Sequence, residues 1–268
     1  MKLALITIAI LLLSECVYCQ FDPGAEQISL SNSGTANEKD VFSLFNNVAC
    51  LQHVNQRELG IYYSPSPFGL KELSNAFIAY TDSFSFGRLA VGVMYYGFEL
   101  YSEKKIVLGY ANNIYDGLSA GIALNLHNVS IKNYGKDFAF YLNGGLSIRI
   151  TDEIYWGFSL SNVNKATFGK EKDQIPSLIK TGLSYNPIGN LTISFAFKKE
   201  TDYAEDFSFG IDYDIIEILS LRSGFSSRIS KYSGGIGIHY SVFNLNYAFV
   251  YHNDLGFTHQ TDLIIVFE

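Results

Sequence analysis

The chain has 268 residues, of which 48% are apolar and only 17% are charged, whereas a typical soluble domain has roughly 25% charged residues. Aromatic residues make up 15%, with 19 Tyr and 21 Phe, and there are 23 Gly against 5 Pro. So many aromatic residues exclude a disordered chain. The net charge of −7 argues against nucleic-acid binding, which recruits clustered Lys and Arg. This composition is typical of a Gly-rich all-β protein.

The first residues have the pattern of a secretory signal peptide. Lys2 precedes an apolar run over residues 3–13, and the small residues Val17 and Cys19 follow it. A basic start, an apolar stretch and small residues three and one before the cut are the features of such a peptide. We therefore expect residues 1–19 to be removed.

Two other interpretations of this N-terminus are weaker. Lipidation at Cys16 is disfavoured because Glu15 stands where a small residue is wanted. A transmembrane helix needs about 20 apolar residues, more than this run provides. The mature chain keeps a single cysteine, Cys50, which excludes a disulfide within it.

Within residues 20–56, a helical periodicity begins at Asn37. Apolar residues recur there at three- and four-residue steps, and Glu38 and Asp40 stand near the start of the pattern. The spacing predicts a short amphipathic helix over residues 38–51, with acidic side chains at its N-terminal end, where the helix dipole favours them.

From residue 57 onward the periodicity changes to two. In residues 118–126, for example, the even positions are apolar and the odd positions are Ser, Gly, Ala and Asn. A sustained period of two predicts β-strands with one apolar face. We expect fourteen strands, near 57–64, 73–81, 86–96, 105–112, 117–127, 138–150, 154–162, 177–186, 190–199, 206–214, 218–225, 231–240, 242–251 and 259–267.

The second face of these strands decides the architecture. A soluble sandwich would carry Lys, Glu, Thr and Gln there, but these positions are mostly Gly, Ser, Ala and Asn. Large apolar faces opposite small polar ones favour an all-β transmembrane antiparallel barrel, with lipid outside and a crowded polar lumen. We also expect the bulk of the aromatic side chains to face lipid.

The connections between the predicted strands alternate in character. Short turns alternate with longer, more charged loops, as periplasmic turns and extracellular loops do in outer-membrane barrels. The sequence thus predicts residues 57–268 as the barrel and residues 20–56 as a short helical hatch. The hatch would either plug the lumen or pack across the periplasmic mouth, and the sequence favours neither.

Residues with catalytic chemistry are scarce. No nucleophile-base motif and no metal-ligand spacing is present, so we expect neither an enzyme nor a cofactor. Charged residues on the small-residue face should point into the lumen, either as an internal ion-pair network, which we favour, or as a site for a ligand carboxylate. These residues are Lys180, Lys198, Asp212 and Arg222.

A protein partner would contact the longer charged loops. The main candidate is the loop over residues 163–175, and residues 131–137 form a second candidate. The charged residues of the main loop are Lys165, Lys170, Glu171, Lys172 and Asp173.

Several segments resemble a known family. Residues 24–25, 34–36 and 40–51 resemble the N-terminal hatch of FadL-like outer-membrane proteins, the long-chain fatty-acid transporter superfamily. Where those proteins have Asn-Pro-Ala-Gly-Leu, this chain has Asn47-Val48-Ala49-Cys50-Leu51. The C-terminal half resembles the PorV/PorQ branch in residues 156–162, 175–176, 221–225, 232–237, 247–249, 255–256 and 258–259. The resemblance spans nearly the whole mature chain and implies a fourteen-stranded barrel with an N-terminal hatch in the bacterial outer membrane.

Two functions follow from this resemblance. The PorV/PorQ branch implies a non-enzymatic component of a type IX-like protein secretion or surface-attachment pathway, which sits in outer-membrane lipid and binds a secretion-system or exported protein. The alternative, implied by FadL, is passive transport of fatty acids or other small hydrophobic compounds. We favour the first because the extracellular loops are short and the inward residues are small.

Overall fold

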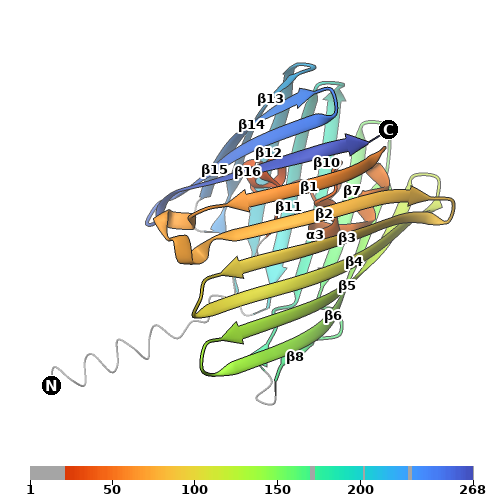
Figure 1. The fold of residues 1–268 in the computed structure, drawn as a ribbon. Coiled ribbons are helices and arrows are strands. Elements are labelled where there is room, and N and C mark those ends of the chain that lie inside the picture. Colours follow the sequence, from red (N-terminus) through yellow and green to blue (C-terminus); the bar gives the residue numbers. More distant parts are fainter. Residues whose placement is uncertain (1–21, 170–172, 202, 229–230, 268) are drawn as a thin grey trace.

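The computed structural model describes residues 22–169, 173–201, 203–228 and 231–267; the predicted signal peptide, residues 1–19, lies outside them. Fourteen strands form one closed antiparallel barrel, in which each strand pairs with its neighbours along the chain and β1 pairs with β16 (Figure 1). The predicted fold class is confirmed. The strands are β1 (Arg57–Ser64), β2 (Asn75–Phe84), β3 (Gly87–Gly97), β4 (Tyr101–Tyr115), β5 (Leu118–Ile131), β6 (Gly135–Arg149), β7 (Ile154–Ser161), β10 (Leu178–Ile188), β11 (Leu191–Glu200), β12 (Asp206–Ile216), β13 (Leu219–Ser226), β14 (Lys231–Tyr240), β15 (Phe243–His252) and β16 (Gly256–Phe267).

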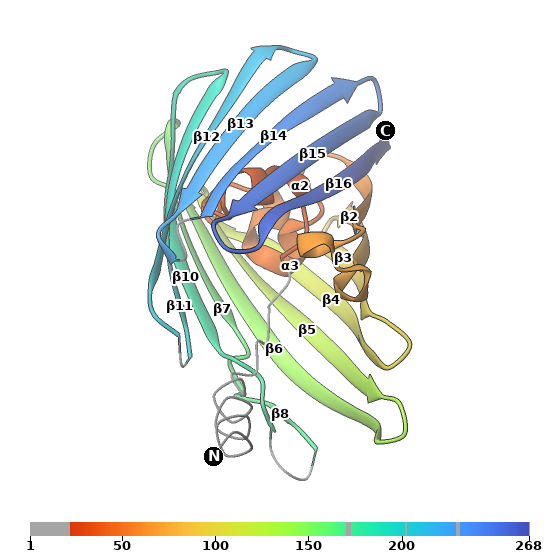
Figure 2. The ribbon, with the colours of Figure 1, turned by 90° about the vertical axis from the view of Figure 1, so that its left-hand side faces the viewer.

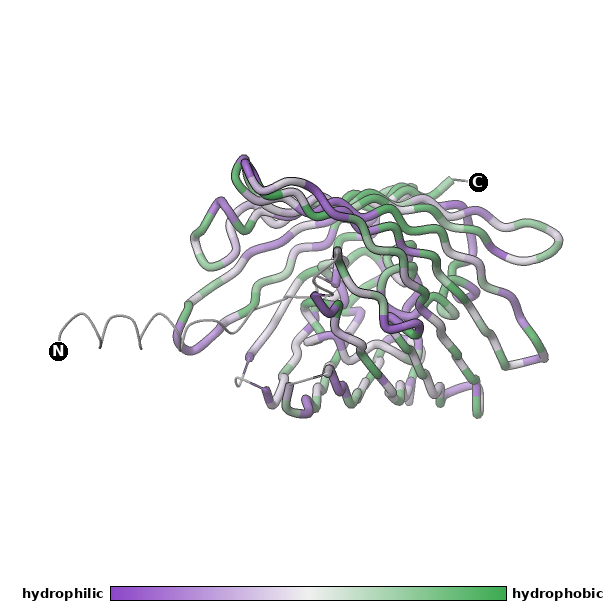
Figure 3. Tube along the Cα trace, turned by 90° about the horizontal axis from the view of Figure 1, so that it is seen from below, coloured by the Kyte–Doolittle hydropathy of each residue, from purple (hydrophilic) through white to green (hydrophobic). Residues whose placement is uncertain are grey.

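Side chains alternate between the outer surface and the lumen, as the pleat of a strand requires. On β5, Ile122 and Leu124 are 46% and 40% exposed on the outside, whereas Ala123 and Asn125 are buried inside. Alternation of hydrophobic and hydrophilic residues along the strands is visible in Figure 3. A closed barrel with an apolar outer surface is the structure that spans the bacterial outer membrane with strands. No helix among the described residues is long and apolar enough to cross a membrane.

The two rims of the barrel differ. Tight turns join β2 to β3, β4 to β5 and β10 to β11 on the rim that carries the start of β1 and the end of β16, which makes it the periplasmic rim. The opposite, extracellular rim has two short 3-10 helices, η2 (Pro67–Gly69) and η3 (Lys71–Leu73), and a small hairpin of β8 (Thr167–Phe168) and β9 (Asp173–Gln174). Residues 131–137, expected to be a longer loop, form only a tight turn between β5 and β6.

Residues 22–56, the hatch segment, lie inside the barrel (Figure 2). The segment contains α2 (Ala25–Ser29), α3 (Ser43–Asn46) and the 3-10 helix η1 (Val48–His53). α2 packs on β13 to β16, and η1 packs on β3 to β6, so the segment crosses the lumen from one wall to the other. The structure therefore shows a plug and not a cover across the mouth.

The single helix predicted over residues 38–51 is wrong. Residues 38–42 are not helical, and α3 and η1 are separated by Asn47, which has extended backbone angles. The side chain of Asn47 donates to the carbonyl oxygens of Thr35 at 2.7 Å and Leu146 at 3.1 Å. Because these bonds join the hatch to itself and to β6, tertiary contacts override the helical periodicity of this segment.

Small luminal residues make room for the hatch. A Cβ atom at Gly157 would lie 2.3 Å from the carbonyl oxygen of Thr35, and one at Gly92 would lie 2.5 Å from the ring of Phe45. Ten of the barrel strands carry a glycine at which a Cβ atom would come close to the hatch. The full set is Gly60, Gly92, Gly109, Gly121, Gly145, Gly157, Gly182, Gly210, Gly224 and Gly235. The small residues of the predicted polar lumen are therefore a contact surface for the hatch.

Candidate functional site

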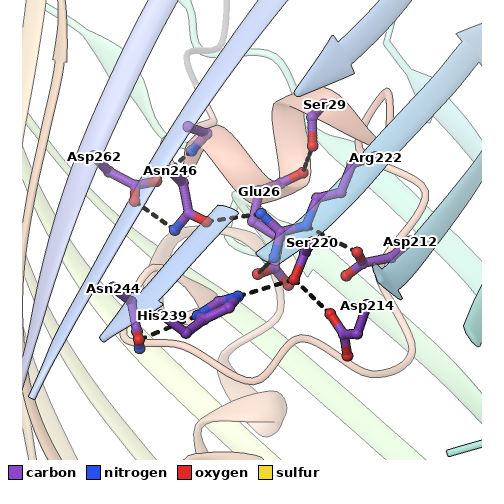
Figure 4. Close-up of polar contacts among 11 residues, drawn as sticks. Glu26, Ser29, Asp212, Asp214, Ser220, Arg222, His239, Asn244, Asn246 and Asp262 are labelled. Atoms are coloured by element: carbon purple, nitrogen blue, oxygen red, sulfur yellow. Dashed lines mark hydrogen bonds and ion pairs between the residues drawn. The ribbon is translucent and has the colours of Figure 1, made fainter. Parts of the chain in front are cut away.

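Among the described residues, most of the buried charged side chains lie where the hatch contacts the barrel wall. The centre of this contact is Arg222 on β13, whose side chain is only 3% exposed. The Arg222 guanidinium contacts Glu26 of α2 at 2.9 Å and Asp212 of the adjacent strand β12 at 3.1 Å. It also donates to Asn246 Oδ1 on β15 at 2.7 Å (Figure 4). One cation therefore joins three strands of the wall to the hatch.

A second anchor continues from Asn246. The Asn246 amide donates to Asp262 Oδ1 on β16 at 2.8 Å, and the other oxygen of Asp262 accepts from the backbone N–H of Ala25. This carboxylate thus caps the first turn of α2, which has no side-chain cap of its own. Glu58 on β1 makes a similar contact, because its Oε2 accepts from the backbone N–H of Val41 at 2.9 Å.

A third anchor lies at the start of the hatch. Lys180 Nζ on β10 contacts Asp22 Oδ2 at 2.7 Å, and both side chains are about 5% exposed or less. Burial alone would raise the pKa of Asp22, but the charges of Lys180 and Lys198 together hold it below its usual range. Lys198 lies opposite Lys180 on the neighbouring strand.

The four predicted luminal residues therefore do not form one cluster. Asp212 and Arg222 are in direct contact, whereas Lys180 pairs with the hatch and Lys198 adds charge beside that pair. The hatch partners Asp22 and Glu26 were not among the residues predicted from the sequence. No spacing signal marks them, because they precede the barrel and reach their partners only through the tertiary fold.

The candidate partner loop lies on the extracellular rim between β7 and β10. Lys165 and Asp173 are exposed there, and Lys170, Glu171 and Lys172 lie outside the described residues. The adjacent Asn164 pairs with the edge of β6, since its side chain accepts from Leu142 N–H at 3.0 Å and donates to the Phe140 carbonyl at 3.1 Å. The side-chain amide of Asn164 thereby satisfies backbone groups of β6 that lie beyond the end of β7.

One sector of the lumen is apolar and aromatic. On β1 to β3, the inward residues Tyr62, Phe77 and Met94 are buried against Phe42 and Phe45 of the hatch. Phe45 meets Phe77 edge to face with ring centroids 5.1 Å apart, and Phe42 meets Tyr62 at 6.3 Å. Tyr62 and Phe77 are therefore exceptions to the expectation that the aromatic side chains face lipid, whereas Tyr63, Tyr80 and Tyr95 on the same strands are exposed on the outside.

The sequence contains no signal that separates the two faces of β1 and β2. Their outward residues, such as Ile61 and Ile78, are as apolar as their inward neighbours Tyr62 and Phe77. Period-two patterning identifies a luminal face only where that face is polar. Apolarity on both faces of a predicted barrel strand is the signal that could have located this sector.

The middle of the hatch holds carboxyl groups without cationic contacts. Oε2 of Glu38 and Oδ2 of Asp40 are buried and have no hydrogen-bond partner. Burial raises the pKa of Glu38, and burial together with the nearby Glu26 raises that of Asp40. Burial also raises the pKa of the Cys50 thiol. Within the described part of the chain, no three His, Cys, Asp or Glu side chains converge to hold a metal ion.

These features define a class of protein: a bacterial outer-membrane β-barrel whose lumen contains a hatch made of its own N-terminal segment. No family model matches the chain, and no curated protein matches its sequence. Solved structures match its fold closely. The toluene transporter TbuX of Ralstonia pickettii has a TM-score of 0.67 at 10% identity, over 93% of this chain and 98% of that one.

Two further structures have the same architecture. A deletion mutant of the monoaromatic hydrocarbon channel TodX has a TM-score of 0.71 at 11% identity, over 94% of this chain and 100% of that one. A FadL homologue of Pseudomonas aeruginosa has a TM-score of 0.66 at 8% identity, over 92% and 98%. The chain therefore has the FadL-like fold.

Proposed function

We propose that the protein is a passive, non-enzymatic outer-membrane carrier for small hydrophobic compounds. The observation that carries this proposal is the apolar sector of β1 to β3, where Tyr62, Phe77 and Met94 face the hatch. A porin for polar solutes has a polar, water-filled lumen, whereas this sector of the lumen is apolar and packs on the apolar side chains of Phe42 and Phe45. The similarity in fold to hydrocarbon transporters supports the same function.

The hatch occupies the position that a hydrophobic ligand would take. Phe42, Leu44 and Phe45 pack on the apolar sector, and burial of such side chains is worth roughly 1.5–3 kcal/mol each. A ligand that replaced these contacts would recover part of that free energy and would lower the cost of moving the hatch. Transport through the apolar sector therefore requires the hatch to shift away from β1 to β3 while the ion pairs on β10 and β13 hold its other side in place.

The experiment measures uptake of a hydrophobic probe, toluene or oleate, by cells that carry the protein in their outer membrane. Met94 is 2% exposed in the apolar sector. Met94→Gln keeps the side-chain length but adds a polar amide, whereas Met94→Leu keeps the sector apolar. We expect uptake to fall in Met94→Gln and to persist in Met94→Leu, with equal amounts of folded barrel. Equal uptake by both variants, or none by the unmodified protein, would reject the proposal.

A second function, favoured by the extracellular rim, is the binding of a protein partner in a type IX-like secretion or surface-attachment pathway. The loop between β7 and β10 is long, exposes Lys165 and Asp173, and includes the β8–β9 hairpin. We rank this function second because the apolar sector has no role in it. Replacement of residues 163–175 by a short Gly-Ser turn should abolish co-purification of a protein partner if this function is the right one.

A further inference from the structure

A separate cavity lies at the periplasmic end of the lumen. It has a volume of about 760 Å³ and is bounded by the periplasmic ends of β4, β5, β6 and β7 and by five hatch residues, Asn37, Lys39, Gln52, His53 and Asn55. The tight turn that joins β4 to β5 forms part of its wall. The cavity therefore opens to the periplasm, and neither Arg222 nor the apolar sector of β1 to β3 lines it.

Neutral hydrogen-bonding groups dominate the wall of this cavity. Four carboxamide side chains line it, from Asn37, Gln52, Asn55 and Asn113. Removing such groups from water without giving them partners costs roughly 1–3 kcal/mol each. A hydrocarbon is therefore a poor ligand, and a molecule with many donors and acceptors is a good one.

Three charged residues line the cavity, and two of them, Arg149 and Asp116, form an ion pair. The Arg149 guanidinium contacts Asp116 at 3.0 Å and Asp152 at 3.8 Å. Lys39 also lines the cavity. His53 is neutral at ordinary pH because burial lowers the pKa of its ring. The wall thus disfavours a cation and provides no concentrated positive charge for a polyanion.

Aromatic rings complete the wall. Tyr155 meets the His53 ring edge to face at 5.8 Å, and Tyr115 stands at the rim with 75% of its surface exposed. A pyranose has apolar C–H faces, which pack on aromatic rings, and a periphery of hydroxyl groups, which pair with amides and with planar charged pairs. Acetamido groups match the same carboxamides.

From this geometry we infer that the cavity is a carbohydrate-binding site, which takes a neutral or weakly charged glycan from the periplasm. The residues of this site differ from those of the apolar sector, because they belong to the hatch and to the periplasmic ends of β4 to β7. Two sources share this chemistry: free oligosaccharides in the periplasm, and the end or side of an insoluble cell-wall glycan that carries acetamido sugars.

The test uses the mature protein purified in detergent and the probe N,N′,N″-triacetylchitotriose, with maltotriose as the probe without acetamido groups. Binding is measured by isothermal titration calorimetry. The test variant is Tyr115→Ala combined with Asn55→Ala, two exposed residues of the cavity wall. The control variant is Tyr240→Ala, a tyrosine that is 70% exposed on the same rim but outside the cavity.

We expect saturable binding of at least one saccharide, weakened about tenfold or more in the test variant and unchanged in the control. Co-sedimentation with insoluble cell-wall glycan, lost in the same test variant, would identify the cell wall as the source; binding of soluble saccharide alone would identify free oligosaccharide. Absence of binding to every saccharide, or equal affinity in the test and control variants, would overturn the inference.

Discussion

Arg222 of β13 and Glu26 of the hatch form an ion pair at 2.9 Å inside the barrel. The Arg222 side chain is 3% exposed and that of Glu26 is 21% exposed, so solvent screens the pair far less than it screens a surface pair. Because Arg222 also contacts Asp212, removal of the arginine would leave two carboxylates without their cation. This pair therefore couples the position of the hatch to the integrity of the wall.

Substitution of this arginine should be costly. We expect Arg222→Met to lower the free energy of unfolding by about 3–5 kcal/mol, because breaking a buried pair leaves uncompensated charge. Urea unfolding in detergent micelles measures the change. Lys199→Met is the control: the pair of Lys199 with Glu205 lies at 2.9 Å with side chains 42% and 53% exposed, and such pairs contribute under about 1 kcal/mol. Similar losses in both variants would contradict the account.

A glycine substitution tests the close contact between hatch and wall. In Gly157→Ala, the new methyl group would lie 2.3 Å from Thr35 O and 2.5 Å from Ala36 Cα, both of which are backbone atoms. We expect a loss of about 1–3 kcal/mol and faster hydrogen exchange in residues 33–49. In Gly144→Ala the methyl group would meet no atom within 4 Å, so this variant should match the unmodified protein. Unchanged exchange in Gly157→Ala would argue against the close contact.

The sequence predicts the barrel much better than its contents. The predicted strand at residues 57–64 has the same bounds as β1, and the one at 73–81 is displaced from β2 by only two or three residues. Strands alternate locally, so their pattern survives in the sequence. The hatch does not follow a local rule: Asn47 interrupts the predicted helix because it bonds to Leu146, a residue 99 positions away.

The same difference between local and tertiary contacts applies to the ion pairs of the candidate site. The pairing of Asp212 with Arg222 follows from the register of adjacent strands, and the sequence places both residues on one face. The pairings of Arg222 with Glu26 and of Lys180 with Asp22 depend on where the hatch lies in three dimensions. No periodicity encodes that position.

The buried carboxyl group of Glu38 predicts a dependence of stability on pH. Burial raises its pKa above the ordinary value of about 4.3, so the folded protein holds a proton that the unfolded chain releases. The corresponding stabilisation is complete below the ordinary pKa and is lost as the pH rises through the raised pKa.

Glu38→Gln removes this titration. The neighbouring charges, Lys180, Asp22 and Glu26, remain in the variant. We therefore expect the variant to gain stability relative to the unmodified protein as the pH increases, in urea unfolding series recorded from about pH 5 to 9. A difference between the two proteins that does not change with pH would show that Glu38 does not titrate in this range.

The hatch should also keep the lumen closed to ions. Residues 22–54 are almost entirely buried within the barrel, and the glycines of the wall lie in direct contact with them. In planar bilayers we expect little conductance from the intact protein and a steady conductance after deletion of residues 22–55. A large, steady conductance of the intact protein would mean that the hatch does not seal the lumen.

The most direct test of the central claim is to identify what the protein carries when it is purified gently from its native membrane. Native mass spectrometry and organic extraction of the same sample report bound small molecules and bound proteins together. The account predicts a hydrophobic compound bound in the lumen, reduced in Met94→Gln and retained in Met94→Leu. A stoichiometric protein partner with no hydrophobic compound in any preparation would contradict it and would favour the partner-binding function.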